Sequence, residues 1–235
     1  MDFKLIYLAR RNPSIPAEDW PRTWRSHAVF ASQFPVISAT VRGLLYCSRV
    51  FDPTLEGAPF RPQGVSLDYD GVGIASGPEP VRAHLSPEVQ ARIDKDELRV
   101  FNTHSPRFSF HCKETLVQGG APGRAAVIRF LARSPATTRE SFLIHFNDQH
   151  ARIGQRAADA LGTVARYVHD TLITDPPPGY PFDAITETWF GSTDHALRAF
   201  VDPVFSAVAE DMAPFCDPEH SVTLVTNVIH RWPRA

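Results

Sequence analysis

The amino-acid sequence is a tandem repeat, and this feature constrains the fold more than any other. A shift of 123 residues superposes the first half on the second, with Arg10 on Arg133, His27 on His150 and Thr40-Val41 on Thr163-Val164. Farther along, a shift of 116 residues places Ser86-Pro87 on Asp202-Pro203 and His104-Ser105 on His220-Ser221. The shift changes across loop segments, as expected when two copies of one module differ in loop length.

The two copies divide the chain into two predicted domains. Residues 118–123, which read Gln-Gly-Gly-Ala-Pro-Gly, have the composition of a linker. We therefore expect one repeat over residues 1–117 and a second over residues 124–235. Each has the usual length of a small domain, roughly 100 residues.

Each copy shows the same order of predicted elements. Apolar runs of strand length occupy 3–9, 41–50, 69–75 and 107–116 in the first copy, and 126–132, 164–173, 183–190 and 222–232 in the second. Apolar residues at helical spacing follow the first strand of each copy. A capping box, Thr137-x-x-Glu140, opens that helix in the second copy. A further helix begins at Ser86-Pro87 and at Asp202-Pro203, where a cap residue precedes a Pro. Gly57 to Gly64 reads as a loop.

This βαββαβ order is ferredoxin-like. Two helices cover one face of such a sheet, and its other apolar face needs a cover, which the second copy can supply. We therefore predict an α+β protein in which two ferredoxin-like repeats form an intrachain pseudo-dimeric α+β barrel.

Composition narrows the class of protein. Hydrophobic residues make up 43% of the chain and charged residues 21%, which favours a packed core over disorder. The net charge is 24 − 26 = −2 without a basic block, so neither nucleic acid nor a membrane is an expected partner. Three scattered cysteines, no secretory signal and no long apolar run favour a cytoplasmic protein. Because the second copy is covalently attached, a monomer or a homodimer is expected. The many aromatic residues favour a small-molecule substrate as the partner.

Both copies resemble the EthD family. The family pattern pairs an arginine at the end of the first strand with two helical aromatics and a histidine. These residues are Arg10, Trp20, Trp24 and His27 in one copy, and Arg133, Phe142, Phe146 and His150 in the other. An aromatic-Asp pair then opens the third strand, at Tyr69-Asp70 and Phe182-Asp183, although only the second copy continues to Glu187 and Trp189. The resemblance implies a dimeric α+β barrel, a superfamily that includes cofactor-free monooxygenases, cyclases, isomerases and haem enzymes.

Histidines are the first candidates for chemistry. An imidazole exchanges protons near neutral pH, so His150, His169 and His27 are candidate general bases, with His150 favoured. A histidine on an apolar helix face is also a common structural residue. Arg129 interrupts an apolar strand where the 123-residue shift places Ile6. It would face the barrel interior if Ile128 and Phe130 face the helices, and it could stabilise an anionic intermediate. An edge-exposed or salt-bridged arginine is the alternative.

The two copies differ at polar strand positions. His169 replaces Tyr46, Glu187 replaces Ile74, and His111 stands where the second copy has Asn227. We expect these residues either to line a cavity or to face water. Glu187 completes the candidate catalytic set, and the candidate substrate-binding residues are Tyr7, Tyr46, His111, Trp24, Phe146, Trp189 and Asn227. Because the second copy has more charged residues in its apolar strands, we expect the better cavity there.

These residues point to a cofactor-independent lyase, isomerase or cyclase acting by general acid–base catalysis on a hydrophobic, aromatic small molecule. A non-catalytic binding or accessory protein, a cofactor-free monooxygenase and a haem-binding barrel are the alternatives. No metal is expected, because His145 and His150 are five residues apart and would lie about 140° apart on an α-helix. The sequence also lacks the motifs that bind nucleotide cofactors.

Overall fold

The computed structural model describes residues 3–50 and 66–233, and every structural statement below refers to these residues. The predicted loop from Gly57 to Gly64 lies outside them. The chain forms two compact units. Unit 1 comprises residues 1–49, 67–112 and 228–235, and unit 2 comprises residues 50–66 and 113–227. Each unit therefore takes most of its residues from one repeat and completes itself with a segment from the other.

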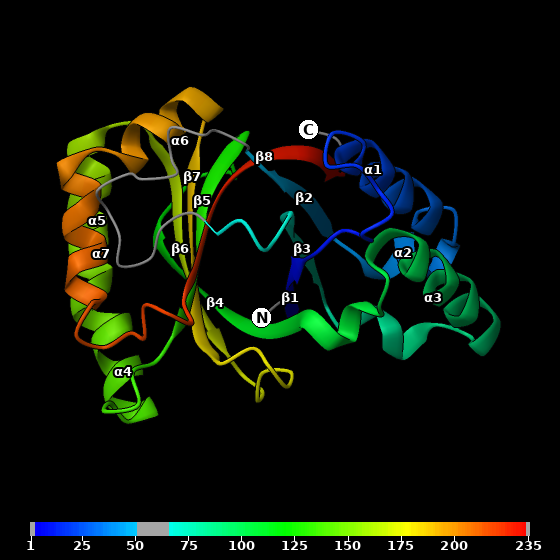
Figure 1. The fold of residues 1–235 in the computed structure, drawn as a ribbon, viewed down its shortest axis with the longest axis horizontal. Coiled ribbons are helices and arrows are strands. Elements are labelled where there is room, and N and C mark those ends of the chain that lie inside the picture. Colours follow the sequence, from blue (N-terminus) through cyan, green and yellow to red (C-terminus); the bar gives the residue numbers. More distant parts are fainter. Residues whose placement is uncertain (1–2, 51–65, 234–235) are drawn as a thin grey trace. The chain divides into compact units, whose positions relative to one another are not determined.

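Unit 1 is a sheet covered on one face by helices. Its elements are β1 (Phe3–Ala9), α1 (Trp20–Ala31), α2 (Pro35–Thr40), β2 (Gly43–Arg49), β3 (Gly71–Gly77), η2 (Val81–His84), α3 (Pro87–Phe101), η3 (Ser105–Phe108), the start of β4 (Ser109–Gln118) and the end of β8 (Val222–Trp232). Figure 1 shows α1, α2 and α3 together on one side of these strands.

Unit 2 has the same layering. It contains β5 (Ala125–Ala132), α4 (Arg139–His145), the π-helical turn η4 (Phe146–His150), α5 (Ala151–Leu161), β6 (Val164–Leu172), β7 (Phe182–Phe190), α6 (Thr193–Phe200) and α7 (Pro203–Met212), with the end of β4 and the start of β8. In Figure 1, α5 and α7 run side by side along the sheet of this unit.

The strand order explains how the repeats share elements. Unit 1 has the order β4-β1-β3-β2-β8, and unit 2 has β8-β5-β7-β6-β4, so the hydrogen-bonded order closes as a barrel. The pairings of β1 with β3 and β4, and of β5 with β7 and β8, are antiparallel. The predicted α+β class and closed barrel are confirmed.

Helix starts test the sequence signals directly. Ser86 and Asp202 cap α3 and α7 as predicted, each accepting a hydrogen bond from a backbone N–H of the first turn. The capping box at Thr137 is wrong by one residue. Thr138 is the N-cap of α4 and accepts the N–H of Ser141, because the helix begins at Arg139.

A glycine in β3 shapes the aromatic core of unit 1. The ring of Tyr7 lies over Gly73, where an added Cβ would come within 2.0 Å of the tyrosine Cζ. Trp24, Phe101 and Phe108 hold the other sides of the Tyr7 ring at centroid distances of 6.1, 6.1 and 5.8 Å. The ring therefore has little room to move aside.

Replacing Gly73 with Ala should lower the free energy of unfolding by about 1–3 kcal/mol, the usual cost of overpacking a core. Gly119→Ala is the matched control, because its Cβ would meet no atom within 4 Å. Urea denaturation of the two variants measures the difference. Equal stabilities would show that Tyr7 is not confined as described.

Candidate functional site

Unit 1 contains an apolar cavity of about 310 Å³ between its sheet and its helices. Apolar side chains from strands and helices form most of its wall, including Leu5, Leu44, Ile37 and Phe101. The polar side chains that line it are Tyr7, His27, Tyr46, Arg82, Glu97, Ser105, Ser109 and His111. Four of the predicted site residues, Tyr7, His27, Tyr46 and His111, are thus brought together at one cavity.

His27 is held by a carboxylate from the neighbouring helix. Its Nδ1 lies 2.6 Å from Oδ2 of Asp96 on α3, and the histidine is buried. Burial would raise the pKa of Asp96, but hydrogen bonds and charge from His27 and Arg99 outweigh it and hold that pKa below its ordinary value. A negative Asp96 fixes the orientation of the ring and leaves Nε2 as the nitrogen available for proton transfer.

Two tyrosines face the same cavity. Tyr7 and Tyr46 both pair with Gly73, one on each side, so they share a face of the sheet, with ring centroids 6.2 Å apart. Burial, and for Tyr7 also the neighbouring Tyr46, raises the pKa of both hydroxyls. Both hydroxyls therefore keep their protons at neutral pH and act as hydrogen-bond donors.

Stacked aromatic rings support this wall. Trp24 stacks on Tyr46 at 4.6 Å and on Trp20 at 5.0 Å, both at small interplanar angles. Trp24, predicted to bind substrate, is completely buried behind Tyr46. His111 stands at the cavity beside Phe3, and burial lowers the pKa of its imidazole.

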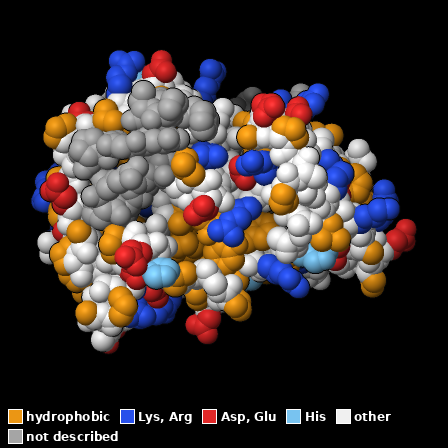
Figure 2. All heavy atoms as spheres, viewed as in Figure 1, with side chains coloured by type: hydrophobic (Ala, Val, Ile, Leu, Met, Phe, Trp, Pro, Cys, Tyr) orange, Lys and Arg blue, Asp and Glu red, His pale blue; other side chains and the backbone are white. Residues whose placement is uncertain are grey.

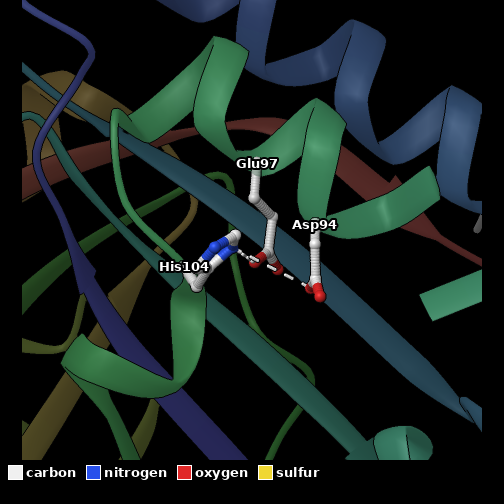
Figure 3. Close-up of side chains that lie close together, drawn as sticks. All are labelled: Asp94, Glu97 and His104. Atoms are coloured by element: carbon white, nitrogen blue, oxygen red, sulfur yellow. Dashed lines mark ion pairs between the residues drawn. The ribbon is translucent and has the colours of Figure 1, made fainter. Parts of the chain in front are cut away.

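An acidic cluster meets the cavity at Glu97, which is one of its lining residues. Figure 3 shows the side chains of Asp94, Glu97 and His104 converging, the first two from α3. Their ligand atoms lie within 4.8 Å of one another, a spacing that a metal ion could bridge. Arg82, however, donates to Asp94 at 3.0 Å and to Glu97 at 2.6 Å. Since the guanidinium already pairs with both carboxylates, we describe this cluster as an ion-pair network at the cavity wall.

Arg129 does not face the barrel interior. Ala125, Val127 and Leu131 lie on the same face of β5 as Arg129, and they pack in the cores beneath the helices of unit 2. Ile128 and Phe130 therefore face the other way, and Arg129 points to the helices, with Cζ 4.4 Å from the ring centroid of Phe205 on α7. The expectation of an interior arginine is wrong, because a period of two gives alternation without showing which face is which.

The π-helical turn brings two histidines together. His145 Nε2 and His150 Nδ1 lie 2.9 and 3.0 Å from the same oxygen of Asp211 on α7. The predicted angle of about 140° between these residues is wrong here, because the turn from Phe146 to His150 is π-helical and places residues five apart on one face. Burial would raise the pKa of Asp211, but hydrogen bonds and charge from His150 and His145 outweigh it and lower that pKa, as His27 and Arg99 do for Asp96.

His150 and His169 lie in a packed core rather than at a cavity. Phe146 stacks on His169 at 4.1 Å, and the Tyr167 hydroxyl lies 2.8 Å from His169 Nε2 and 3.5 Å from His150 Nε2. Burial lowers the pKa of both imidazoles, and the pKa of His169 falls well below its ordinary value. Both rings are therefore neutral at pH 7.

The remaining predicted residues lie apart from this group. Glu187 is next to Thr186 in β7, so it faces the opposite side of the sheet, where its Oε2 accepts a 2.8 Å hydrogen bond from Trp189. Asn227 is half-buried near the end of the paired part of β8, opposite Ala125. Arg129, His169, Glu187 and His111 thus do not converge on one cavity.

Strand pairing gives the true correspondence of the repeats. Tyr7-Gly73-Tyr46 in unit 1 matches Arg129-Thr186-His169 in unit 2. The counterpart of Arg129 is therefore Tyr7 and not Ile6. His111 pairs with Leu5, and Val225 pairs with Val127, so Val225 is the counterpart of His111 in place of Asn227. The sequence shift misplaced both by one or two residues.

Unit 2 has a pocket of about 410 Å³ whose lining includes Arg133, Arg139 and Asp183, but His150, His169 and Glu187 do not line it. A substitution explains why the place in unit 2 that corresponds to the apolar cavity of unit 1 is nearly filled. Leu44 and Ala31 line the cavity, and the 123-residue shift places Tyr167 and Gly154 at their positions. A Cβ on Gly154 would lie 2.1 Å from the Tyr167 ring, so the tyrosine fills the space next to this glycine. Beside them remains a hollow of about 10 Å³.

The sequence analysis missed four polar residues, which are Arg82, Asp96, Glu97 and Asp211. Asp96 and Asp211 are equivalent under a shift of 115 residues, one less than the shift used for this region. Comparing acidic residues of the helices that begin at Ser86-Pro87 and Asp202-Pro203, with shifts of 115 to 117 residues, would have found this pair.

Comparison with known proteins agrees with the fold. The EthD domain model matches residues 134–219, which confirms the resemblance within the second repeat. A solved structure from Fusobacterium nucleatum, described as a candidate monooxygenase, superposes with a TM-score of 0.59 at 8% identity, over 98% of this chain and 93% of that one. One from Lactobacillus acidophilus, described in the same way, has a TM-score of 0.51 at 9% identity, over 98% and 94%. No curated protein matches the chain in sequence.

The described helices and surface are consistent with the composition. None of the helices in the described part of the chain is long and apolar enough to cross a bilayer. On the face shown in Figure 2, acidic and basic side chains are interspersed and no patch of one charge stands out. This face therefore offers no strong electrostatic attraction for a polyanion.

The neutral histidines of unit 2 make stability depend on pH. Because burial lowers the pKa of His169 in the folded state, only the unfolded chain takes up its proton just below about pH 6.5. The free energy of unfolding should therefore fall as the pH falls through that value. His169→Gln should reduce the slope by up to about 1.4 kcal/mol per pH unit.

Denaturation at pH 7.5 and pH 5.5 measures this slope. The control is His195→Gln, at an exposed position on α6. An unchanged slope in His169→Gln would show that the folded protein protonates His169 as readily as the unfolded chain does.

Proposed function

We propose that the cavity of unit 1 is the active site of a cofactor-independent acid–base enzyme that acts on a hydrophobic, aromatic small molecule. One observation carries the proposal: the buried His27, paired with the half-buried Asp96, lines an apolar cavity that two protonated tyrosines also line. A base, an orienting carboxylate and hydrogen-bond donors around one cavity are the components of general acid–base catalysis.

His27 is the proposed general base. Its Nε2 takes a proton from a weakly acidic C–H or phenolic O–H of the substrate, and Asp96 at Nδ1 stabilises the imidazolium that forms. The sequence analysis favours His150 for this role. The assignment moves to the equivalent histidine of the first repeat, because His27 lines a cavity and His150 is packed between Phe146 and Tyr167.

Tyr7 and Tyr46 are the proposed partners of the charge that develops on the substrate. Loss of a proton next to a carbonyl or on a phenol leaves an enolate or phenolate oxygen, and preorganised hydroxyl donors stabilise such an oxygen in a dry site. His27 then returns the proton to a different carbon, which completes an isomerisation, or to a leaving group as its bond to the substrate breaks, which completes an elimination. In a cyclisation the enolate carbon attacks a carbonyl carbon of the same molecule, and the proton goes to the alkoxide that forms.

The cavity wall sets the class of substrate. Its volume is at the lower end of the range for small-molecule sites, roughly 300–1,000 Å³, and most of its lining is apolar. A compact aromatic molecule with one oxygen function fits these dimensions. For the fold, we also propose that each repeat, residues 1–117 and 124–235, is one ferredoxin-like module.

Cofactor-free monooxygenation is the second candidate. The two solved structures described as candidate monooxygenases favour it. Its first step is also the formation of an electron-rich anion by a base, so the same residues serve it. Consumption of dioxygen during turnover distinguishes the two reactions, because the acid–base reaction proceeds equally without oxygen.

The repeat provides a matched control for the proposed base. His27→Gln should lower turnover by about 10²–10⁴-fold, the usual loss on removing a general acid or base. His150→Gln removes the equivalent histidine from unit 2 and should leave turnover within about three-fold, since His150 does not line the cavity. Substrates are first found by screening phenols and aromatic ketones for thermal stabilisation of the protein, and turnover is then followed by absorbance.

The screen also addresses the third possibility, a non-catalytic binding protein. Ligands that stabilise the wild-type protein but undergo no change would support that role over catalysis. Loss of turnover in His150→Gln but not in His27→Gln would return the active site to the second repeat.

A further inference from the structure

His111 is a cavity residue whose hydrogen-bonding groups are unused. It lines the cavity of unit 1 from β4, is half-buried, and contacts Phe3 in an edge-to-face arrangement of the two rings. Among the described residues, no group forms a hydrogen bond or an ion pair with either ring nitrogen. Burial lowers the pKa of this imidazole, so at pH 7 the ring is neutral and has one N–H donor and one acceptor nitrogen.

The other polar groups near the start of β4 are engaged with one another. Ser109 Oγ donates to the carbonyl of Ser105 at 2.6 Å, and Ser105 Oγ donates to Glu97 at 2.7 Å. Glu97 also accepts a hydrogen bond from Arg82 at 2.6 Å. Of these described lining residues, His111 is therefore the one with a donor and an acceptor to offer a ligand.

The fold does not require a histidine at this position. His111 pairs with Leu5 of β1, and its counterpart in unit 2 is Val225, which pairs with Val127 of β5. Both valines pack in one apolar core cluster beneath the helices. Since a valine fills the equivalent position of the other repeat, packing alone does not account for the imidazole.

The sheet places His111 and His27 at opposite ends of the cavity. One row of cavity-lining side chains crosses the sheet from β4 to β2 and consists of His111, Leu5, Ala75 and Leu44. On β2, two residues beyond Leu44, Tyr46 lies nearly parallel to the ring of His27, at a centroid distance of 6.4 Å. The proposed base therefore stands at the β2 end, and the unused imidazole at the β4 end.

The distance between the two ends restricts the ligand. Neighbouring strands are about 4.8 Å apart, so a row across four strands is about 14 Å long between its end Cα atoms. The middle of the row, Leu5 and Ala75, is apolar. Two fused aromatic rings with a polar atom at each end fit such a span better than a single ring does.

We propose that His111 recognises a second oxygen function of the substrate, which is a bicyclic aromatic molecule with a hydroxyl or carbonyl oxygen at each end. This inference rests on the proposed function, because the first oxygen is the one that Tyr7 and Tyr46 bind beside His27. It narrows the substrate class from an aromatic molecule with one oxygen function. A neutral imidazole donates to a carbonyl, and it donates to or accepts from a hydroxyl. His111 thus determines specificity and takes no part in the chemical step.

Two matched probes test this role. They are 2,6-dihydroxynaphthalene and 6-methyl-2-naphthol, which differ only in a methyl group that replaces one hydroxyl. Titration with the protein, followed by the fluorescence of each probe, gives the two dissociation constants, and their ratio measures the preference for the diol. His111→Phe should lower this preference at least five-fold, because the phenyl ring offers no hydrogen bond to the second hydroxyl. His195→Phe, the same substitution at an exposed position on α6, should leave the ratio unchanged.

A second variant keeps the test decisive if His111→Phe does not fold. His111→Val introduces the residue that unit 2 has at the equivalent position, and it should lower the preference to the same extent. An unchanged ratio in either variant, or a wild-type protein that binds neither probe saturably, would overturn the proposal. Binding is measured here without turnover. A preference that falls in His111→Phe therefore supports the second oxygen site even if His27→Gln retains full turnover and the proposed base is rejected.

Discussion

A histidine–aspartate pair beneath the helices organises both units. His27 and Asp96 join α1 to α3, and His150 and Asp211 join η4 to α7, with Nδ1 bound to the carboxylate in each case. Because the carboxylate takes Nδ1, Nε2 is the nitrogen left for other partners, and in unit 2 that nitrogen lies 3.5 Å from Tyr167 on β6. The pair fixes both the packing of two helices and the orientation of one imidazole, which gives the scaffold a base in a defined position.

The strand residues on the helix-facing side of the sheet differ between the two units. In unit 1 the row is Tyr7-Gly73-Tyr46, and the ring of Tyr7 lies flat over the glycine, which no other residue at that position would allow. In unit 2, Tyr167 rises beside Gly154 and fills the space that Leu44 and Ala31 leave open in unit 1. The same backbone therefore encloses a cavity in one unit and a packed polar core in the other.

The sequence predicted the elements far better than the contacts. The apolar runs predicted the strand positions, and Ser86 and Asp202 predicted the starts of α3 and α7. These signals are local in the sequence. The face of Arg129 did not follow, because the alternation in β5 shows a direction only once Val127 is found in one core cluster with Phe205 of α7. The meeting of His145 and His150 on Asp211 was hidden as well, because a π-helical turn has no clear sequence signal.

The duplicated histidine is therefore weak evidence for catalysis on its own. A His–Asp pair that ties two helices together is retained in a unit whose base is walled off by Phe146 and Tyr167, so packing alone accounts for it there. What distinguishes His27 is access: its ring lines an apolar cavity that two protonated tyrosines also line. Geometry of this kind can be lost through one large side chain, as Tyr167 shows, while the fold and the pair persist. In a fused repeat, one unit can thus specialise in chemistry because the other continues to supply the scaffold.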